Sequence, residues 1–435
     1  MERFAMKKLL RWKEKKNRKP MLLKGARQVG KTWLMKEFGR RYFKHTAYVN
    51  FDNNKYMKDV FDNDYDIERI LLAVNIASGT KIVPGETLII FDEIQENPKA
   101  IASLKYFCED APEYAVIAAG SLLGVAIHEG VPFPVGKVDT LELNPLSFRE
   151  FLYAVEEDGL GNLLEVQNED LLKSYREKYI DWLKKYYYIG GMPEVVATFV
   201  ENKDFTEVRY LQKKIIEMYE DDFSKHTTGS ELPRIRMVWN SIPMQLAKEN
   251  KKFFFGKIKE GARSKDFEIA IEWLQDCGMI KKVYNLSKPY VPLKAYVEFS
   301  AFKLYLLDVG LLGALSELDA RTILEGNVIF TEFKGALTEQ YVLQQLITDT
   351  EYTPYYYSES KAESEIDFVI QKENHIVPIE VKAEENLRAK SLRVYCDKYK
   401  PEIAIRTSMS DYREQEWMVN VPLYLLTEYL KKVSV

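Results

Sequence analysis

The chain is poor in cysteine and histidine. It has three cysteines, Cys108, Cys277 and Cys396, and four histidines in 435 residues. The cysteines lie far apart in sequence, so they form neither a disulfide framework nor the paired spacing of a zinc site. Free cysteines suit a reducing compartment, and we expect a cytoplasmic protein.

The chain also lacks a long apolar run, an excess of basic charge and a low-complexity linker. No stretch of about 18 apolar residues occurs, so we expect no membrane span. The net charge of −4 argues against nucleic-acid binding over the whole surface, but it leaves a local basic face open. The length predicts roughly two to four domains.

Strand-like and helix-like segments alternate between Met21 and Asn144. "MLLKG", "TAYVNFD", "TLIIFDEI" and "AVIAAGS" are apolar strand patterns, and helical stretches lie between them. This alternation predicts an α/β fold with a parallel sheet that helices cover on both faces.

A phosphate-binding loop follows the first of these strands. "GARQVGKT" has the pattern G-x-x-x-x-G-K-[ST] between a strand and a helix, which is the context that the motif requires. Glycines let the backbone approach phosphate oxygens, Lys31 reaches the β- and γ-phosphates, and Thr32 can ligate Mg²⁺. The sequence therefore predicts ATP and Mg²⁺ as cofactors. The nucleotide-binding residues of the loop are Gly25, Ala26, Arg27, Gln28, Val29, Gly30, Lys31 and Thr32.

The third and fourth strands supply the other parts of a nucleotide site. Asp92 ends the third strand and can hold Mg²⁺, while Glu93 beside it can polarise a water for attack on the γ-phosphate. Ser121, at the end of the fourth strand, can sense the γ-phosphate. The alternative is that Ser121 is a serine at the junction of a strand and a turn that does not contact the nucleotide. Arg149 is a candidate arginine finger, against the alternative of a solvated helix arginine.

Six stretches carry a resemblance to a known family. They are "GARQVGKT", "FDEIQ", "AAGSLL", "LNPLSFREFL", "YYIGGMPE" and "FKLYLLDVGLL". Together they resemble the AAA-type ATPases that carry a C-terminal DUF4143 domain. The resemblance implies a P-loop ATPase core with a helical lid, followed by the DUF4143 region, and it supports the nucleotide site.

The middle of the chain is mostly helical. The segment from Pro233 to Asn285 contains three helix-like pieces, followed by the strand-like "IKKVYNL", and this order predicts a winged helix-turn-helix. The basic run "KENKKFFFGKIKEGARSK" favours DNA binding, whereas acids in the last helix favour a protein-packing module. Both alternatives stay open, and so do DNA, RNA or a protein as partner and the oligomeric state.

A second set of acids lies near the end of the chain, in "EIDFVIQKENHIVPIEVKAEE". Asp367 and Glu380 lie on two adjacent strand patterns, and Lys382 shares a face with Glu380. With Glu339 on the preceding helix, the pattern resembles the PD-(D/E)xK nucleases. That resemblance implies Asp367, Glu380 and Glu339 as metal ligands and Lys382 as a catalytic lysine. The alternative is a Glu380–Lys382 ion pair beside a surface acid.

These segments predict four domains and two competing functions. The predicted domains are the AAA-like core (1–160), the helical lid (161–230), the winged-helix-like domain (231–300) and a small restriction-endonuclease-like α/β domain (301–435). The first hypothesis is an ATPase that is coupled to a nucleic-acid-directed nuclease domain. The second is a nucleotide-switched interaction protein whose nuclease-like domain is inactive.

Overall fold

The structure is a computed structural model that describes residues 2–62, 64–121, 123, 133–227, 229, 231–248, 251–325, 331–359, 364–384 and 389–433. Contacts divide the chain into two compact units. The N-terminal unit comprises Glu2–Asn144 and Asp276–Met279, and the C-terminal unit comprises Pro145–Gln275 and Ile280–Val435. No helix within the described ranges is long and apolar enough to cross a membrane.

The N-terminal unit is built on a parallel sheet. Its strands are β1 (Met21–Lys24), β2 (His45–Asn50), β3 (Thr87–Asp92), β4 (Ala115–Ala119) and β5 (Asp139–Glu142), in the order β2-β3-β4-β1-β5. Every pair is parallel. The four predicted strands are therefore confirmed. The sequence analysis did not predict the edge strand β5, which is short and has a single buried residue.

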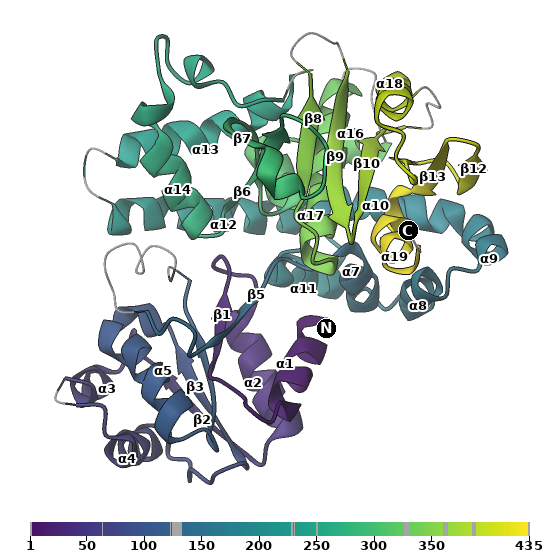
Figure 1. Cartoon of the computed structure of the whole chain (residues 1–435). Coiled ribbons are helices and arrows are strands. Elements are labelled where there is room, and N and C mark those ends of the chain that lie inside the picture. The colour runs from purple at the N-terminus through teal and green to yellow at the C-terminus, as the bar shows by residue number, and fades with distance from the viewer. Residues whose placement is uncertain are drawn as a thin grey trace. The chain divides into compact units, whose positions relative to one another are not determined.

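Helices cover both faces of this sheet (Figure 1). They are α1 (Ala5–Glu14), α2 (Lys31–Tyr42), α3 (Lys55–Val60), α4 (Ile67–Ser78) and α5 (Pro98–Asp110), with a 3-10 turn, η1 (Ile94–Glu96). Buried side chains of α3, α4 and α5 form one core with alternate residues of β2, β3 and β4. The strands β3 and β4 are buried along their whole length, as expected for a parallel sheet between two helical layers.

The C-terminal unit begins with a helical region. Its helices are α7 (Phe148–Ala154), α8 (Asp158–Val166), α9 (Glu169–Ser174), α10 (Arg176–Ile189), α11 (Pro193–Asn202), α12 (Phe205–His226), α13 (Leu232–Leu246), α14 (Glu268–Asp276), α15 (Val309–Leu315), α16 (Ala320–Glu325) and α17 (Thr331–Asp349). Asp308 joins distant parts of it. Its carboxylate accepts hydrogen bonds from the Gly191 N–H at 2.6 Å, from the Leu311 N–H at 3.0 Å and from Gln344 at 2.9 Å.

The same unit contains a mixed sheet of eight strands in the order β12-β13-β11-β10-β9-β8-β6-β7. The strands are β6 (Ile280–Leu286), β7 (Val297–Leu306), β8 (Tyr355–Ser358), β9 (Glu365–Lys372), β10 (His375–Val381), β11 (Ile405–Ser408), β12 (Arg413–Gln415) and β13 (Met418–Pro422). The helix α18 (Lys390–Tyr399) covers one face, and α17 packs against β10 on the other. The chain continues through η6 (Leu423–Leu425) into α19 (Leu426–Lys432).

The predicted winged helix is not confirmed. Between residues 231 and 300 the structure has α13 and α14, which are the first and third predicted helices. The middle one, around residues 255–262, is only a 3-10 turn, η2 (Phe255–Lys257), and a second such turn, η3 (Ser264–Asp266), precedes α14. Gly256 and Gly261 interrupt that stretch, and glycine disfavours a helix interior. The expected wing, β6 and β7, forms the edge of the eight-stranded sheet. The second α/β unit is therefore larger than the sequence suggested.

Candidate functional site

The phosphate-binding loop joins β1 to α2 in the N-terminal unit. Gly25 and Gly30 have φ angles of 139° and 90°, which side chains other than glycine rarely adopt. A Cβ atom on Gly25 would lie 2.3 Å from the Leu143 carbonyl oxygen. Both glycines of the motif therefore occupy positions whose backbone conformation favours glycine. The helix α2 begins directly after the loop, at Lys31.

Lys31 is buried inside this loop. Its Nζ donates to the carbonyl oxygens of Gly25 at 2.9 Å and Ala26 at 2.8 Å, and to Ser121 Oγ at 3.2 Å. Burial lowers the pKa of Lys31 to about 8, although the charges of Glu93 and Asp92 oppose the shift. Lys31, at the start of α2, and Ser121, shortly after β4, were each predicted to contact the nucleotide, and the two side chains lie together.

Thr32 and Asp92 form an oxygen pair beside Lys31. The Thr32 hydroxyl donates to Asp92 Oδ2 at 2.7 Å, and Asp92 is only 2% exposed at the end of β3. The Tyr48 hydroxyl on β2 donates to the same oxygen at 2.9 Å. Burial, followed by the charge of Asp92, raises the pKa of Tyr48 to about 12, so this phenol stays a neutral donor. Hydroxyl and carboxylate oxygens are ligands that suit Mg²⁺.

Glu93 follows in a left-handed conformation, with φ of 50°. Its carboxylate accepts a hydrogen bond from Gln95 Nε2 at 2.6 Å. Gln95 reaches this place over Gly120, since a Cβ atom there would lie 2.1 Å from the Gln95 side-chain oxygen. Gln95 and Tyr48 are therefore site residues that the sequence reasoning missed. The only signal for Gln95 was its place two residues after Glu93.

The remaining loop residues are held from outside the motif. Ala26 and Val29 are buried, and Gln28 has a positive φ of 65°. Arg3, which is 4% exposed, donates to the Val29 carbonyl oxygen at 3.0 Å and to the Asn144 carbonyl oxygen at 2.6 Å. Arg27 lies inside the same loop, as the motif predicted. The loop conformation is thus fixed by a buried arginine from the start of the chain.

Arg149 has a different environment from that of an arginine finger. Its guanidinium is buried in the C-terminal unit, where Nη1 pairs with Glu428 at 3.2 Å and Nε donates to the Gly161 carbonyl oxygen at 3.0 Å. It also donates to the Tyr153 hydroxyl at 3.0 Å and pairs with Glu165. These contacts tie α7 to α8 and α19, so Arg149 acts as a structural anchor.

In the C-terminal unit, a β-bulge decides where Asp367 points. The register between β8 and β9 shifts there, so that Asp367 and Phe368 together lie opposite Tyr356 alone. A bulge of this kind re-aims a side chain. Asp367 thus faces α17, where it forms a hydrogen bond with Glu339, and its Oδ2 accepts the Val381 N–H at 2.7 Å.

Glu380 lies on the opposite face, under α18. Its carboxylate pairs with Lys382 at 3.0 Å, and its charge acts on the Cys396 thiol of α18. Burial raises the pKa of Glu380, and Lys382 and Arg406 only partly offset it. The two adjacent strand patterns predicted for Asp367 and Glu380 are confirmed, and β9 and β10 form an antiparallel hairpin. However, the side chains of Asp367 and Glu380 project from opposite faces of the sheet. The expected convergence of these two carboxylates on one ion is therefore not found.

Two lysines fill the space around Glu339 and Asp367. Lys303 is fully buried and pairs with Glu365 and, at 3.7 Å, with Glu339, while Lys251 pairs with Glu339 from the other side. Burial raises the pKa of Asp367 to about 8, and the negative charge of Glu339 adds to this effect. Burial opposes ionisation of Glu339 too, but the two lysines hold its pKa at about 2.

The raised pKa of Asp367 favours its neutral form, and the ion pairs of Lys251 and Lys303 supply cationic partners for Glu339 and Glu365 from the chain itself. Within the described part of the chain, no group of three or more histidine, cysteine, aspartate or glutamate side chains is placed to hold a metal ion.

Three family models match separate parts of the chain. Residues 17–152 match the AAA domain, residues 180–322 match a domain of unknown function, DUF8612, and residues 334–426 match another, DUF4143. The comparison with curated proteins gave no match. The matches support a P-loop ATPase with a DUF4143 region, and they do not give the DUF4143 region a nuclease character.

Several solved structures are similar to the chain. A Walker-type ATPase of Pyrococcus abyssi has 14% sequence identity and a TM-score of 0.47, over 72% of this chain and 95% of that one. The ORC1 protein of Aeropyrum pernix in complex with DNA has 14% identity and a TM-score of 0.26, over 72% and 90%. Drosophila ORC bound to AT-rich DNA and Cdc6 has 14% identity and a TM-score of 0.23, over 72% and 89%. Likenesses this low identify neither a ligand nor a partner of this chain.

Proposed function

We propose that the protein binds and hydrolyses ATP with Mg²⁺ at the loop between β1 and α2. The observation that carries the proposal is the convergence of Lys31, the Thr32–Asp92 oxygen pair and Glu93 at one edge of the parallel sheet. The match of residues 17–152 to the AAA domain supports the same conclusion.

Each residue has a role that follows from its place. Thr32 and Asp92 would hold Mg²⁺, which when bound neutralises phosphate charge. Lys31 would exchange the carbonyl oxygens of Gly25 and Ala26 for phosphate oxygens. Glu93 would accept the proton of the attacking water, and Gln95 would fix the direction of that carboxylate.

Two substitutions test this site. Lys31→Ala should abolish ATP binding in equilibrium titration. Glu93→Gln should retain binding but lower turnover by about 10²–10⁴-fold, the usual contribution of a positioned general base. Arg41→Ala is the matched control, because Arg41 lies on the same helix, is exposed and pairs with Glu37. ATP turnover by the Lys31→Ala protein at the wild-type rate would overturn the proposal.

For the C-terminal unit we propose a role as a nucleotide-switched interaction or regulatory module, without metal-dependent nuclease activity. Two features support this choice over the nuclease hypothesis. Asp367 and Glu380 leave opposite faces of the sheet, and Lys251 and Lys303 already balance the charge beside Glu339. A nuclease site would instead need free carboxylate oxygens that share one cation.

A cleavage assay distinguishes the two hypotheses. Wild type, Asp367→Ala and Glu380→Ala proteins are incubated with Mg²⁺ or Mn²⁺ and single-stranded, duplex and branched nucleic acid, with and without ATP. We expect no cleavage by any of the three. Cleavage by the wild type that both variants lose would establish the nuclease and refute the interaction role.

The finer domain description also belongs to this proposal. The four-domain division, with an ATPase core, a lid, a winged-helix-like segment and an endonuclease-like C-terminal part, stays a prediction. Its support in the C-terminal part is the β9–β10 hairpin with α17 on one face and α18 on the other. A cytoplasmic location likewise stays a prediction.

A further inference from the structure

The first helix of the N-terminal unit belongs to a strongly basic segment. Residues 1–20 contain nine lysines and arginines but two glutamates, whereas the whole chain has 62 basic and 66 acidic residues. One face of α1 is buried through Met6, Leu9 and Trp12, and the Trp12 ring lies 6.3 Å from the ring of Phe38 on α2. The apolar face of α1 is therefore part of the core of its own unit.

Three basic side chains form what we call the α1 face: Lys7, Lys8 and Arg11. All three are exposed, and Arg11 follows Lys7 by four residues and Lys8 by three, so it neighbours both on the helix surface. Within the described ranges none of the three forms an ion pair; Lys7 lies over the ring of Phe4, at 5.7 Å. Glu14, one turn beyond Arg11, is exposed and forms no ion pair there either. Like charges at these spacings destabilise a helix, and no described acid relieves their repulsion by pairing.

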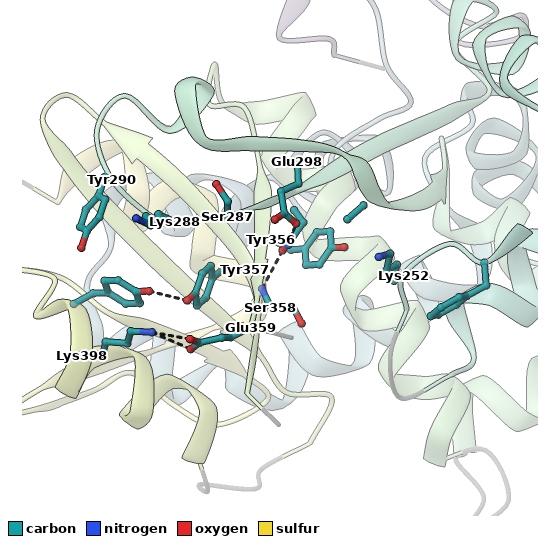
Figure 2. Close-up of a pocket in the computed structure, with 14 residues that line it drawn as sticks. Lys252, Ser287, Lys288, Tyr290, Glu298, Tyr356, Tyr357, Ser358, Glu359 and Lys398 are labelled. Atoms are coloured by element: carbon teal, nitrogen blue, oxygen red, sulfur yellow. Dashed lines mark hydrogen bonds and ion pairs between the residues drawn. The ribbon is translucent and has the colours of Figure 1, made fainter. Parts of the chain in front are cut away.

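Lysines in the C-terminal unit show the contrast. In a cavity beside β6 and β8, Lys398 donates to both carboxylate oxygens of Glu359, at 3.0 and 2.9 Å (Figure 2). Lys251 and Lys303 pair with Glu339. Because the cations of the α1 face have no such carboxylate among the described residues, they are available to an external anion.

The segment after α1 adds one more cation. Lys16 is exposed and forms no ion pair with a described residue, whereas Lys15 pairs with Asp139 at 3.0 Å. Arg18 and Lys19 instead donate to backbone carbonyl oxygens of the same unit. The α1 face and Lys16 together therefore offer four cations.

Acidic residues gather at another place in the same unit. Residues 52–68 contain six aspartates and glutamates but two lysines. They span α3 and the start of α4, which pack with α5 on one side of the sheet, whereas α1 packs with α2 on the other (Figure 1). The N-terminal unit is thus electrically polarised, and this polarity directs an anionic partner toward α1.

The surroundings of the α1 face narrow the kind of anion. A helix binds a membrane interface through its apolar face, and that face of α1 is already buried. Single-stranded nucleic acids are held by stacking on aromatic rings, but Trp12 is only 2% exposed and Phe4 is partly buried. Cations without exposed rings suit the phosphates of a duplex. The major groove of B-form DNA admits a helix, whereas that of an RNA duplex is too narrow, so DNA fits best.

We propose that α1 binds the phosphate backbone of duplex DNA without reading its sequence. Lys7, Lys8 and Arg11 would each neutralise a phosphate, which removes their mutual repulsion, and Lys16 would supply a fourth contact. Backbone contacts position a protein on DNA but carry no sequence information. The proposal goes beyond the ATPase activity and does not depend on it, because no residue of the α1 face is assigned to the ATP site.

The test measures the fluorescence anisotropy of a labelled DNA duplex of about 20 base pairs, long enough for more than one helical turn. Full-length protein is titrated without nucleotide at several salt concentrations. Four phosphate contacts predict that the logarithm of affinity falls with the logarithm of salt with a slope of about −3.6. Lys8→Gln/Arg11→Gln should weaken binding at least about fivefold at low salt and bring the slope to about −1.8. Lys8→Arg/Arg11→Lys keeps both charges and should bind like the wild type.

A matched control separates the α1 face from the net charge of the protein. Lys55→Gln/Lys58→Gln on α3 removes the same charge at the same three-residue spacing, so it should keep the wild-type affinity and slope. Circular dichroism should show that all variants are folded, and their ATP turnover without DNA should equal that of the wild type.

Loss of affinity and slope in the α1 variant alone supports the proposal. If the duplex does not bind at low salt, or if the α1 and α3 variants bind alike, the proposal is refuted. Unlabelled RNA duplex and polyglutamate are added as competitors at equal charge. Displacement by either one as strong as by unlabelled DNA would assign the face to RNA or to an acidic protein and would also overturn the proposal.

Discussion

The protonation of Asp367 is the property that most clearly separates a charge-balanced cluster from a metal site. Asp367→Asn preserves the contacts of a protonated aspartate. The amide oxygen can accept the Val381 N–H, and the amide nitrogen can donate to Glu339. The substitution therefore imitates the neutral acid and removes only its ability to lose the proton.

The magnitude follows from the difference in proton binding. Burial raises the pKa of Asp367 from 3.8 to about 8 in the folded protein. Between these values the unfolded chain has released the proton and the folded chain keeps it. The free energy of unfolding of the wild type therefore falls as pH rises through this window, by about 1.4 kcal/mol per pH unit. The Asn variant lacks this loss, so its free energy of unfolding should rise by roughly 3 kcal/mol relative to that of the wild type between about pH 5 and pH 7.

Urea unfolding at several pH values measures this difference. Far-ultraviolet circular dichroism and tryptophan fluorescence follow the wild type and the Asp367→Asn variant in parallel. All other titrating groups are shared, so their contributions cancel in the difference. A difference that stays constant from about pH 5 to pH 7 would refute the reasoning, because it would mean that Asp367 is ionised in the folded protein, as a metal ligand must be.

Three further substitutions test individual contacts. Lys303→Met should lower the free energy of unfolding by about 3–5 kcal/mol, because it removes the buried cation that Glu365 and Glu339 share and leaves Glu339 with Lys251 alone; urea unfolding measures this loss. Arg149→Met should cost about 3 kcal/mol, because it removes one of the two cations that pair with Glu428 and leaves Lys431 alone there, yet ATP turnover per folded molecule should stay unchanged; a selective loss of turnover would restore the arginine-finger role. Tyr48→Phe should cost only about 1 kcal/mol through the lost bond to Asp92, and it should change the Mg²⁺ concentration needed for half-maximal turnover.

The nucleotide site could be read from the sequence because its parts are local. The loop residues are contiguous, Asp92 ends a buried strand, and the carboxyl ends of parallel strands meet at one edge of a sheet. Gln95 and Tyr48 were missed because their roles depend on side-chain contacts across strands and over Gly120. A sequence pattern gives no such distances.

The C-terminal unit was harder to predict for a physical reason. Alternation along β9 and β10 predicts which side chains share a face, but the bulge at Asp367 and Phe368 breaks that alternation. Lys303 and Lys251 belong to segments that are distant in sequence, so the residues around Asp367 do not predict these two ion-pair partners. The hairpin was predictable from local pattern, whereas the direction of its acids was not.

The most direct test of the account is a crystal structure with Mn²⁺ and a non-hydrolysable ATP analogue, in which anomalous scattering locates the metal. The account predicts a manganese peak beside Thr32 and Asp92, and none between Asp367, Glu339 and Glu380. A peak ligated by Asp367 and Glu380, or the lack of one beside Thr32 with the analogue bound, would contradict it.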